Sequence, residues 1–182
     1  MKIKNALVAF GLVSVALPLA LVTTSPALAA GIPWDMGSDT CDTVTIKSLA
    51  NNQYVAAEVD YAGYYSGMLR ARTKSPGAWE KFSLCPGPGY KTLYSLGAKR
   101  YVSAEKNYTG ADKGMLRARA DSFKSFEQFA VDCEADTEHC TIRSIATGKY
   151  VSAELAYAND GYAMLRARAD TVGSYERFLI TI

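Results

Sequence analysis

The sequence predicts an all-β domain built from three similar units of four short strands each. The run Met-Leu-Arg-Ala-Arg occurs three times, at residues 68–72, 115–119 and 164–168. Strand-forming residues (Val, Ile, Thr, Tyr and Phe) come in runs of four to six, separated by Gly, Asn, Asp, Ser and Pro. No stretch keeps helical spacing for three turns. A repeat period of 47–49 residues indicates a repeat architecture.

Each unit has the same order of segments. In the first unit, strands are expected from Thr45, over 54–58, over 68–72 and after Trp79. In the second unit the corresponding segments begin at Thr92, Tyr101, Met115 and Phe126. In the third unit they begin at Thr141, Tyr150, Met164 and Tyr175.

Alternation along the third strand assigns its residues to two faces. Because neighbouring side chains of a strand point in opposite directions, Leu69 and Ala71 share one face and Arg70 and Arg72 share the other. We expect Leu69, Ala71 and the following Phe82 to face a core, and the arginines to face outward.

The last residues, 178–182, are strand-like and apolar to the end of the sequence. Such a strand needs partners on both sides, which a closed ring of units supplies. Three closed units of four strands describe a β-trefoil, a single domain over residues 43–182. Its repeats are expected at about 43–85, 90–133 and 139–182.

The first residues have the pattern of a signal peptide, assigned to 1–29. Lys2 and Lys4 precede an apolar run over 6–22, and Ala27-Leu28-Ala29 has the small-x-small form of a cleavage site. A membrane anchor is the alternative, but Pro18 interrupts the run. We therefore expect a secreted, extracellular protein with an N-terminal extension over residues 30–42.

Removal of residues 1–29 makes the protein formally neutral. The leader carries two lysines and no acid, so Lys+Arg falls from 20 to 18, against 18 Asp+Glu. Neutrality disfavours nucleic acid as a partner, and no membrane association is expected after cleavage.

Four cysteines suggest two disulfides in an oxidising compartment, with three possible pairings. Zinc is the alternative, but the sequence has no C-x-x-C and only one histidine, His139. No metal is expected. No cofactor is expected either, because Gly87 and Gly89 lie among prolines and open no helix.

The segments YVSAE, MLRAR and FEQF resemble the repeat unit of fascin-like β-trefoils, and the resemblance covers residues 43–182 in all three copies. In that fold the first and fourth strands of a unit pair. The resemblance therefore implies a Cys41–Cys85 disulfide at the first unit. It also implies a Cys133–Cys140 disulfide at the turn between the second and third units.

The sequence favours binding over catalysis. His139 has no repeated partner for a nucleophile–base arrangement. Two carboxylates suffice for glycosidase chemistry, but such sites are single, whereas the repeated acids come in threes. No catalytic residue is assigned, and the protein is not expected to be an enzyme.

The candidate ligand-binding residues follow the second strand of each unit, where loops on a rigid scaffold often carry function. A tyrosine ring can pack against a sugar face while a carboxylate accepts hydroxyl hydrogen bonds. The predicted residues are Glu58, Asp60, Tyr61, Glu105, Asn107, Tyr108, Glu154 and Tyr157, with Arg70, Arg117, Arg166 and Trp79 as a second set.

The alternative interpretation of these residues is structural. Tyr61 and its counterparts would then hold their loops, and Arg72 would pair with Glu80 on a neighbouring strand. The first site is expected to be the most complete, because Tyr64 and Tyr65 add rings to it and Trp79 stands where the other units have a Phe or Tyr. The third site lacks the acceptor of the other two, since Ala156 occupies that position.

Several weak, equivalent sites suit a polymer. The resemblance to secreted trefoils implies a carbohydrate-binding module or lectin for a polysaccharide or other glycan. Alternatives are a protein-binding fascin-like module, of actin-binding or protease-inhibitor type, and a structural envelope protein.

Overall fold

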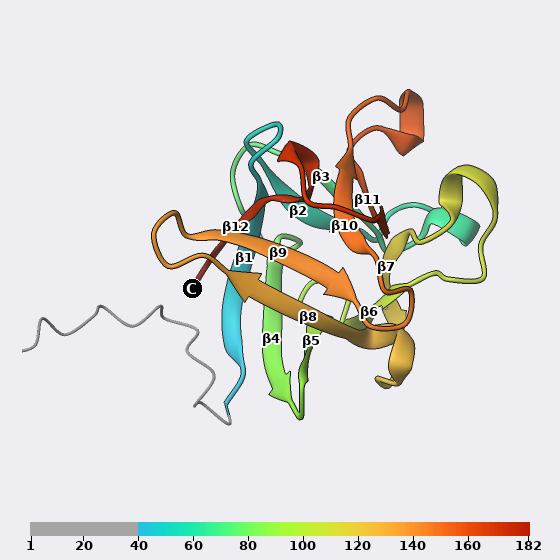
Figure 1. Cartoon of the computed structure of the whole chain (residues 1–182). Helices are drawn as coiled ribbons and strands as arrows, with labels where there is room; N and C mark the ends of the chain where they lie inside the picture. Colours follow the sequence, from blue (N-terminus) through green and yellow to red (C-terminus); the bar gives the residue numbers. More distant parts are fainter. Residues whose placement is uncertain (1–39) are drawn as a thin grey trace, which may run out of the picture. The chain divides into compact units, whose positions relative to one another are not determined.

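The computed structural model describes residues 40–182. The predicted signal peptide and most of the predicted N-terminal extension lie outside the described residues. Within residues 40–182 the chain forms twelve strands and five one-turn 3-10 helices (Figure 1). The strands are β1 (Asp42–Ser48), β2 (Gln53–Glu58), β3 (Met68–Thr73), β4 (Lys81–Gly87), β5 (Tyr90–Ser95), β6 (Arg100–Ala104), β7 (Leu116–Ala120), β8 (Gln128–Cys133), β9 (His139–Ser144), β10 (Tyr150–Glu154), β11 (Met164–Ala169) and β12 (Phe178–Thr181). The 3-10 helices are η1 (Gly63–Tyr65), η2 (Gly110–Asp112), η3 (Ser125–Glu127), η4 (Asn159–Gly161) and η5 (Ser174–Glu176).

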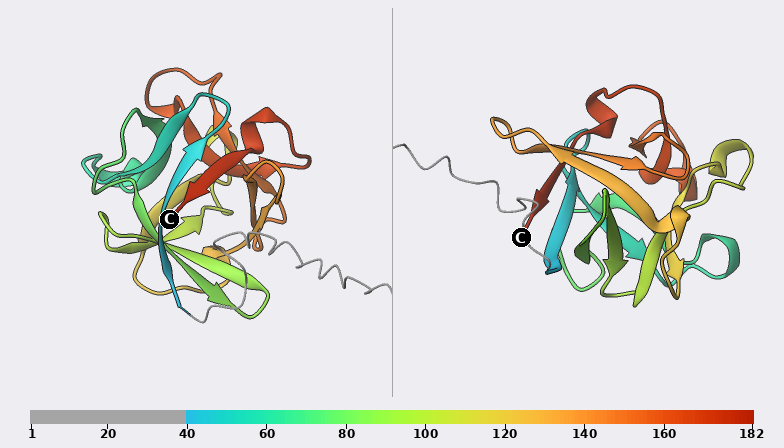
Figure 2. Two further views of the ribbon diagram at one scale, coloured as in Figure 1. Left: turned by 90° about the vertical axis from the view of Figure 1, so that its left-hand side faces the viewer. Right: turned by 60° about the horizontal axis from the view of Figure 1, so that its bottom comes forward.

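The first and fourth strands of each unit close a barrel. In the described part of the chain, its six antiparallel pairs are β1–β4, β4–β5, β5–β8, β8–β9, β9–β12 and β12–β1. The terminal strand β12 has a partner on each side, as its apolar sequence predicts. Figure 2 shows β12 running beside β1, close to the C-terminus.

The second and third strands of each unit form a hairpin, and the three hairpins meet at one end of the barrel. They are β2–β3, β6–β7 and β10–β11. The third strands touch in a ring, in which the methionine of one unit lies opposite the first arginine of the next. The pairs are Met68 with Arg117, Met115 with Arg166, and Met164 with Arg70. The fold is a β-trefoil, and the predicted fold class is confirmed.

The core follows the predicted alternation. Leu69, Ala71 and Phe82 are fully buried, as are the counterparts Leu116, Phe129 and Phe178. Removing one such large side chain from water stabilises the fold by about 1.5–3 kcal/mol. The three methionines of the repeated run form a second cluster with Tyr65, Tyr108 and Tyr157. The Met, Leu and Ala of each run are thus all committed to packing.

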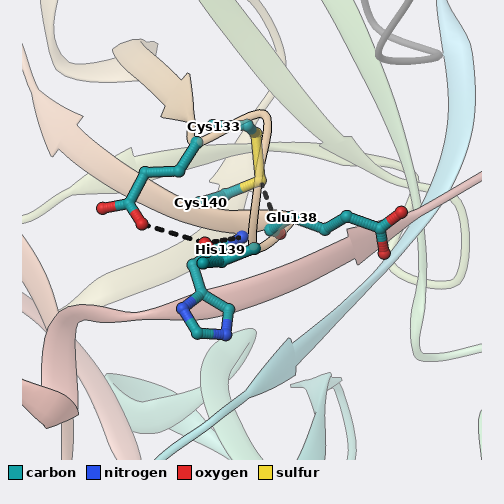
Figure 3. Close-up of a disulfide and its surroundings, with 6 residues drawn as sticks. Cys133, Glu138, His139 and Cys140 are labelled. Atoms are coloured by element: carbon teal, nitrogen blue, oxygen red, sulfur yellow. Dashed lines mark hydrogen bonds between the residues drawn. A yellow bond between two sulfur atoms is a disulfide. The ribbon is translucent and has the colours of Figure 1, made fainter. Parts of the chain in front are cut away.

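Two disulfides join Cys41 to Cys85 and Cys133 to Cys140, the pairing that the resemblance implied. The first is next to the paired residues Asp42 and Leu84 of β1 and β4. The second connects cysteines that face each other on β8 and β9 (Figure 3). Disulfides are consistent with an extracellular protein.

The described residues offer neither a helix that could cross a membrane nor a cluster of metal ligands. Across residues 40–182, no helix is long and apolar enough to cross a membrane. In the same residues, no group of three or more His, Cys, Asp or Glu side chains could hold a metal ion.

Candidate functional site

The first arginine of each repeated run is buried between two units. Arg70, Arg117 and Arg166 are only 4%, 7% and 4% exposed. The prediction that these arginines face outward is wrong. The outer face of each third strand is covered by the 3-10 turn of another unit, and the guanidinium lies between the two.

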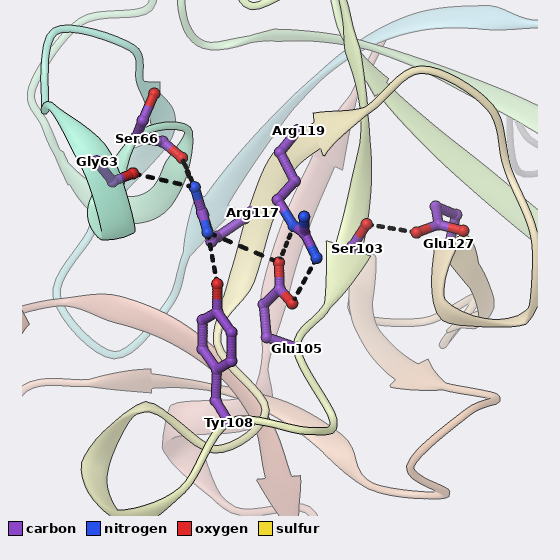
Figure 4. Close-up of polar contacts among 8 residues, drawn as sticks. All are labelled: Gly63, Ser66, Ser103, Glu105, Tyr108, Arg117, Arg119 and Glu127. Carbon is purple, nitrogen blue, oxygen red and sulfur yellow. Dashed lines mark hydrogen bonds and ion pairs between the residues drawn. The ribbon is translucent and has the colours of Figure 1, made fainter.

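Arg117 shows how this contact is made (Figure 4). Its Nε donates to the carbonyl oxygen of Ser66 at 2.9 Å, and one terminal nitrogen reaches the carbonyl oxygen of Gly63 at 3.4 Å. The other terminal nitrogen donates to the hydroxyl of Tyr108 at 2.6 Å. The second unit thereby holds the η1 turn of the first unit.

The same contact recurs around the molecule. Arg70 binds the carbonyl oxygens of Asn159 and Tyr162, so the first unit holds the turn of the third. Arg166 binds those of Gly110 and Lys113, so the third unit holds the turn of the second. We call these three contacts the arginine clamps. They form a closed cycle, since each unit holds one neighbour and is held by the other.

The predicted tyrosines belong to the clamps. The hydroxyls of Tyr61, Tyr108 and Tyr157 each accept a hydrogen bond from the clamp arginine of the same unit. The hydroxyl of Tyr61 also donates to Asp160 at 3.3 Å. The predicted residues Tyr61 and Arg70 are therefore brought together, and so are their counterparts, with their polar groups already engaged inside the protein.

The predicted glutamates pair with the second arginine of each run. Glu58, Glu105 and Glu154 bind Arg72, Arg119 and Arg168. Their carboxylates are mostly covered, whereas the arginines are about half exposed. The expected pairing of Arg72 with Glu80 is wrong, because Glu58 on the adjacent strand β2 takes that position.

These ion pairs affect titration. The hydrogen bond from Arg72 to Glu58 raises the pKa of Arg72, and that from Arg119 to Glu105 raises the pKa of Arg119. In the third unit, burial raises the pKa of Glu154, although Arg168 and Arg166 oppose this shift.

The third set of repeated acids caps a turn in each unit. One carboxylate oxygen of Glu80, Glu127 and Glu176 accepts the backbone N–H three residues earlier, at 2.7 Å in each case. In the second and third units the other oxygen accepts a hydrogen bond from a buried serine, Ser103 or Ser152. The first unit has Ala56 at this position. Therefore no group within residues 40–182 donates a hydrogen bond to Oε1 of Glu80.

A pocket of about 390 Å³ lies at Ala56, where the first unit lacks the serine of the other two. Its lining is Ala56, Ala57, Glu58, Val59, Asp60, Arg72, Thr73, Trp79 and Glu80. It brings together three predicted residues, Glu58, Asp60 and Trp79. Tyr61 does not line it. Asn107, the predicted acceptor of the second unit, is exposed in the turn after β6.

Trp79 forms a fixed wall of this pocket. Its side chain is 42% exposed, while its backbone oxygen accepts a hydrogen bond from Ala57 N at 3.1 Å. The indole packs on Gly97, where a Cβ atom would lie 2.4 Å from a ring carbon. Beside it, Glu80 is only 5% exposed. The pocket therefore contains both an exposed aromatic residue and a carboxylate with one oxygen that has no donor in the described chain.

Sequence reasoning missed Ala56, Arg72, Thr73 and Glu80 as parts of this pocket. The available signal was departure from the repeat. Ala56 replaces the serine of the other two units, and Thr73 replaces the alanine of Ala120 and Ala169.

Comparison with known proteins identifies the fold of this chain but assigns it to no sequence family. No family model matches the chain, and no curated protein matches it. The designed three-fold symmetric protein ThreeFoil is 14% identical, with a TM-score of 0.64 over 77% of this chain and 98% of that chain. The BEL β-trefoil is 8% identical, with a TM-score of 0.61 over 81% of this chain and 97% of that chain.

Part of a larger enzyme has the same fold. The exo-β-1,3-galactanase 1,3Gal43A of Clostridium thermocellum is 11% identical, with a TM-score of 0.63 over 81% of this chain. The match covers 31% of the galactanase chain, so this chain spans about a third of that enzyme. At such identities the likeness shows the fold alone.

Proposed function

We propose that this protein is a secreted, non-catalytic carbohydrate-binding β-trefoil of the fascin-like type, which binds polysaccharide at the pocket of its first unit. One observation carries the proposal: the pocket is lined both by Trp79, whose side chain is 42% exposed, and by Glu80, one of whose oxygens has no donor within residues 40–182. Together they supply an aromatic face for packing and a free hydrogen-bond acceptor, the two features that sugar-binding sites commonly combine.

The chemistry of the pocket suits a sugar ring. The C–H face of a pyranose packs on an indole, and its hydroxyls donate to carboxylates. Glu80 and Asp60 supply acceptors, and the half-exposed guanidinium of Arg72 supplies donors. A hydrogen bond to a charged group contributes about 1.5–3 kcal/mol, so a few such contacts give weak to moderate affinity.

The equivalent positions of the other units support weaker contacts. Phe126 and Tyr175 are exposed rings where the first unit has Trp79. The buried serines, however, already donate to Glu127 and Glu176. We therefore propose one principal site and up to two auxiliary ones, whose joint occupation by a polymer raises the apparent affinity.

The fold is compatible with this role, since a galactanase contains a similar domain. A protein-binding module or a structural envelope protein remains the alternative, and the experiment below separates them.

The decisive experiment compares retention of the purified protein on insoluble cellulose, chitin, xylan, mannan and β-1,3-galactan. Wild-type protein should be retained on at least one of them. Trp79→Ala should lose most of this retention because the stacking surface is gone. Ala56→Ser should weaken it as well, because the new hydroxyl would donate to Glu80 as Ser103 and Ser152 donate in the other units.

Two controls complete the test. Phe126→Ala removes the equivalent ring of the second unit and should change retention much less than Trp79→Ala does. Incubation with the retained polysaccharide should release no reducing ends. Failure on all five polymers, or equal retention of the Trp79 and Phe126 variants, would overturn the proposal and favour the protein-binding alternative.

A further inference from the structure

A second groove lies between the second and third units, and its charged lining is basic. It has a volume of about 310 Å³, and five of its nine lining residues are Lys106, Lys113, Lys149, Arg166 and Arg168. The other four are glycine, threonine or alanine, so no acidic side chain lines the groove.

The pseudo-symmetry shows that two of these five charges, those of Lys106 and Lys113, have no basic counterpart at either of the other junctions. The equivalent groove between the first and second units has a volume of about 270 Å³. Arg117 and Arg119 line it at the positions of Arg166 and Arg168. It has Val59, Ser66 and Arg100 at the positions of the three lysines. At the junction of the third and first units, the same positions hold Leu155, Tyr162 and Gln53. Three lysines therefore gather at only one of three equivalent junctions.

Several of these cations face solvent. Lys106 and Lys113 are exposed, and neither makes an ion pair within residues 40–182. Lys149 pairs with Asp170, whose side chain is 79% exposed and can move away. Arg168 pairs with Glu154 but remains 52% exposed. Arg166 is occupied by its clamp and adds only its charge.

The charge is local rather than global. Without residues 1–29 the protein is formally neutral, so it lacks the basic field that draws a protein to nucleic acid or an anionic membrane. A compact basic groove on a neutral protein instead favours one anionic group held at close range.

We propose that this groove binds a sulfate or phosphate ester group carried by a saccharide. The ester oxygens would accept hydrogen bonds from Lys106, Lys113 and Lys149, with the charge of Arg168 beside them. The saccharide as carrier of the ester rests on the proposed function, whereas the oxyanion site rests on the groove alone.

The test uses dextran sulfate and unmodified dextran, which share a glucan backbone and differ in the ester. Wild-type protein should bind dextran sulfate more tightly than dextran by calorimetry, and the difference should shrink as salt increases. The double variant Lys106→Val with Lys113→Ser, which copies the first groove, should weaken dextran sulfate binding by about tenfold or more.

A matched control removes the same charge elsewhere. Lys81 and Lys124 are exposed and lie outside both grooves. Lys81→Val with Lys124→Ser should leave the affinity within about twofold, if local contacts rather than net charge are responsible. Thermal unfolding of both double variants establishes that they fold.

The reverse exchange gives a second readout. Val59→Lys with Ser66→Lys builds the lysines into the first groove and should add a second oxyanion site, seen as a higher stoichiometry for glucose 6-sulfate or glucose 6-phosphate. Competition between these two esters identifies which oxyanion is preferred.

The outcomes separate the two proposals. Trp79→Ala should leave the difference in affinity between dextran sulfate and dextran unchanged, even if it abolishes polysaccharide retention. Equal binding of dextran and dextran sulfate, or equal effects of the groove and control double variants, would overturn the oxyanion site without affecting the first.

Discussion

Nε of Arg70 donates a 2.9 Å hydrogen bond to the backbone carbonyl oxygen of Tyr162, which lies 92 residues further along the chain. The bond ties the first unit to the third, the two that are most distant in sequence. With Arg117 and Arg166 in equivalent contacts, every junction of the trefoil has one buried guanidinium.

Arg117→Lys should destabilise the protein by about 2–4 kcal/mol, because a lysine cannot reach the tyrosine hydroxyl and two carbonyl groups at once. Guanidinium unfolding measures this loss. The control is Arg119→Lys, two residues along the same strand. Since Arg119 is about half exposed, its replacement should cost no more than about 1 kcal/mol. Equal losses would contradict the clamp.

Gly67→Ala should be more damaging than Gly63→Ala. Both glycines have positive φ values, +77° and +65°, so both substitutions carry the backbone cost. Only at Gly67 would the new Cβ atom meet another unit, 2.4 Å from the carbonyl oxygen of Ala118, whereas nothing lies within 4 Å at Gly63. The difference should be about 1–3 kcal/mol in the free energy of unfolding. A smaller loss at Gly67 than at Gly63 would show that the junction is loose.

The two disulfides should contribute unequally. The bond from Cys41 to Cys85 spans 44 residues and that from Cys133 to Cys140 spans 7. In the chain-entropy model these loops correspond to about 4 and about 2.5 kcal/mol, respectively. Paired Cys→Ala variants, compared by denaturant unfolding, should show the larger loss for the first bond. The reverse order would mean that chain entropy does not dominate.

Glu154 should titrate above the ordinary glutamate pKa of 4.5, because burial raises its pKa. A raised pKa means that the folded state binds the proton more tightly than the unfolded state. The stability from this proton is therefore fully present below pH 4.5 and is lost as the pH rises through the raised pKa. Carboxyl ¹³C NMR titration measures the midpoint.

Glu134 is the internal control for this titration. A hydrogen bond from Thr137, followed by one from Arg177, lowers the pKa of Glu134. Its midpoint should therefore lie below 4.5, and its contribution to stability should be lost as the pH falls through that midpoint. A midpoint of Glu154 at or below that of Glu134 would contradict the assigned burial.

The fold could be predicted because its determinants repeat. Alternation in the repeated run identified Leu69 and Ala71 as core, and the apolar end of the chain indicated ring closure. These are local properties of a strand and its neighbours. Arg70 was placed wrongly because its environment comes from a turn of another unit, which strand alternation does not describe.

The candidate pocket depended on the opposite kind of signal. Repeated acids were expected to mark the site, but Glu58 is engaged by Arg72, and Glu80 is available only because Ala56 is not a serine. Which carboxylate has a spare oxygen depends on the packing between strands, so the departure of Ala56 from the repeat could be interpreted only once the serine–glutamate contacts of the other units were seen.

The cyclic arrangement of the clamps constrains how this chain can change. A substitution in the repeated run weakens a junction between two lobes, so the residues of this run are needed for stability in all three copies. The side chains of Val59, Ser66 and Trp79 and of their counterparts take no part in the clamps, which use only backbone oxygens there, so these side chains can vary in one lobe at a time. The molecule can therefore acquire different ligands on each of its three sides while its architecture stays the same.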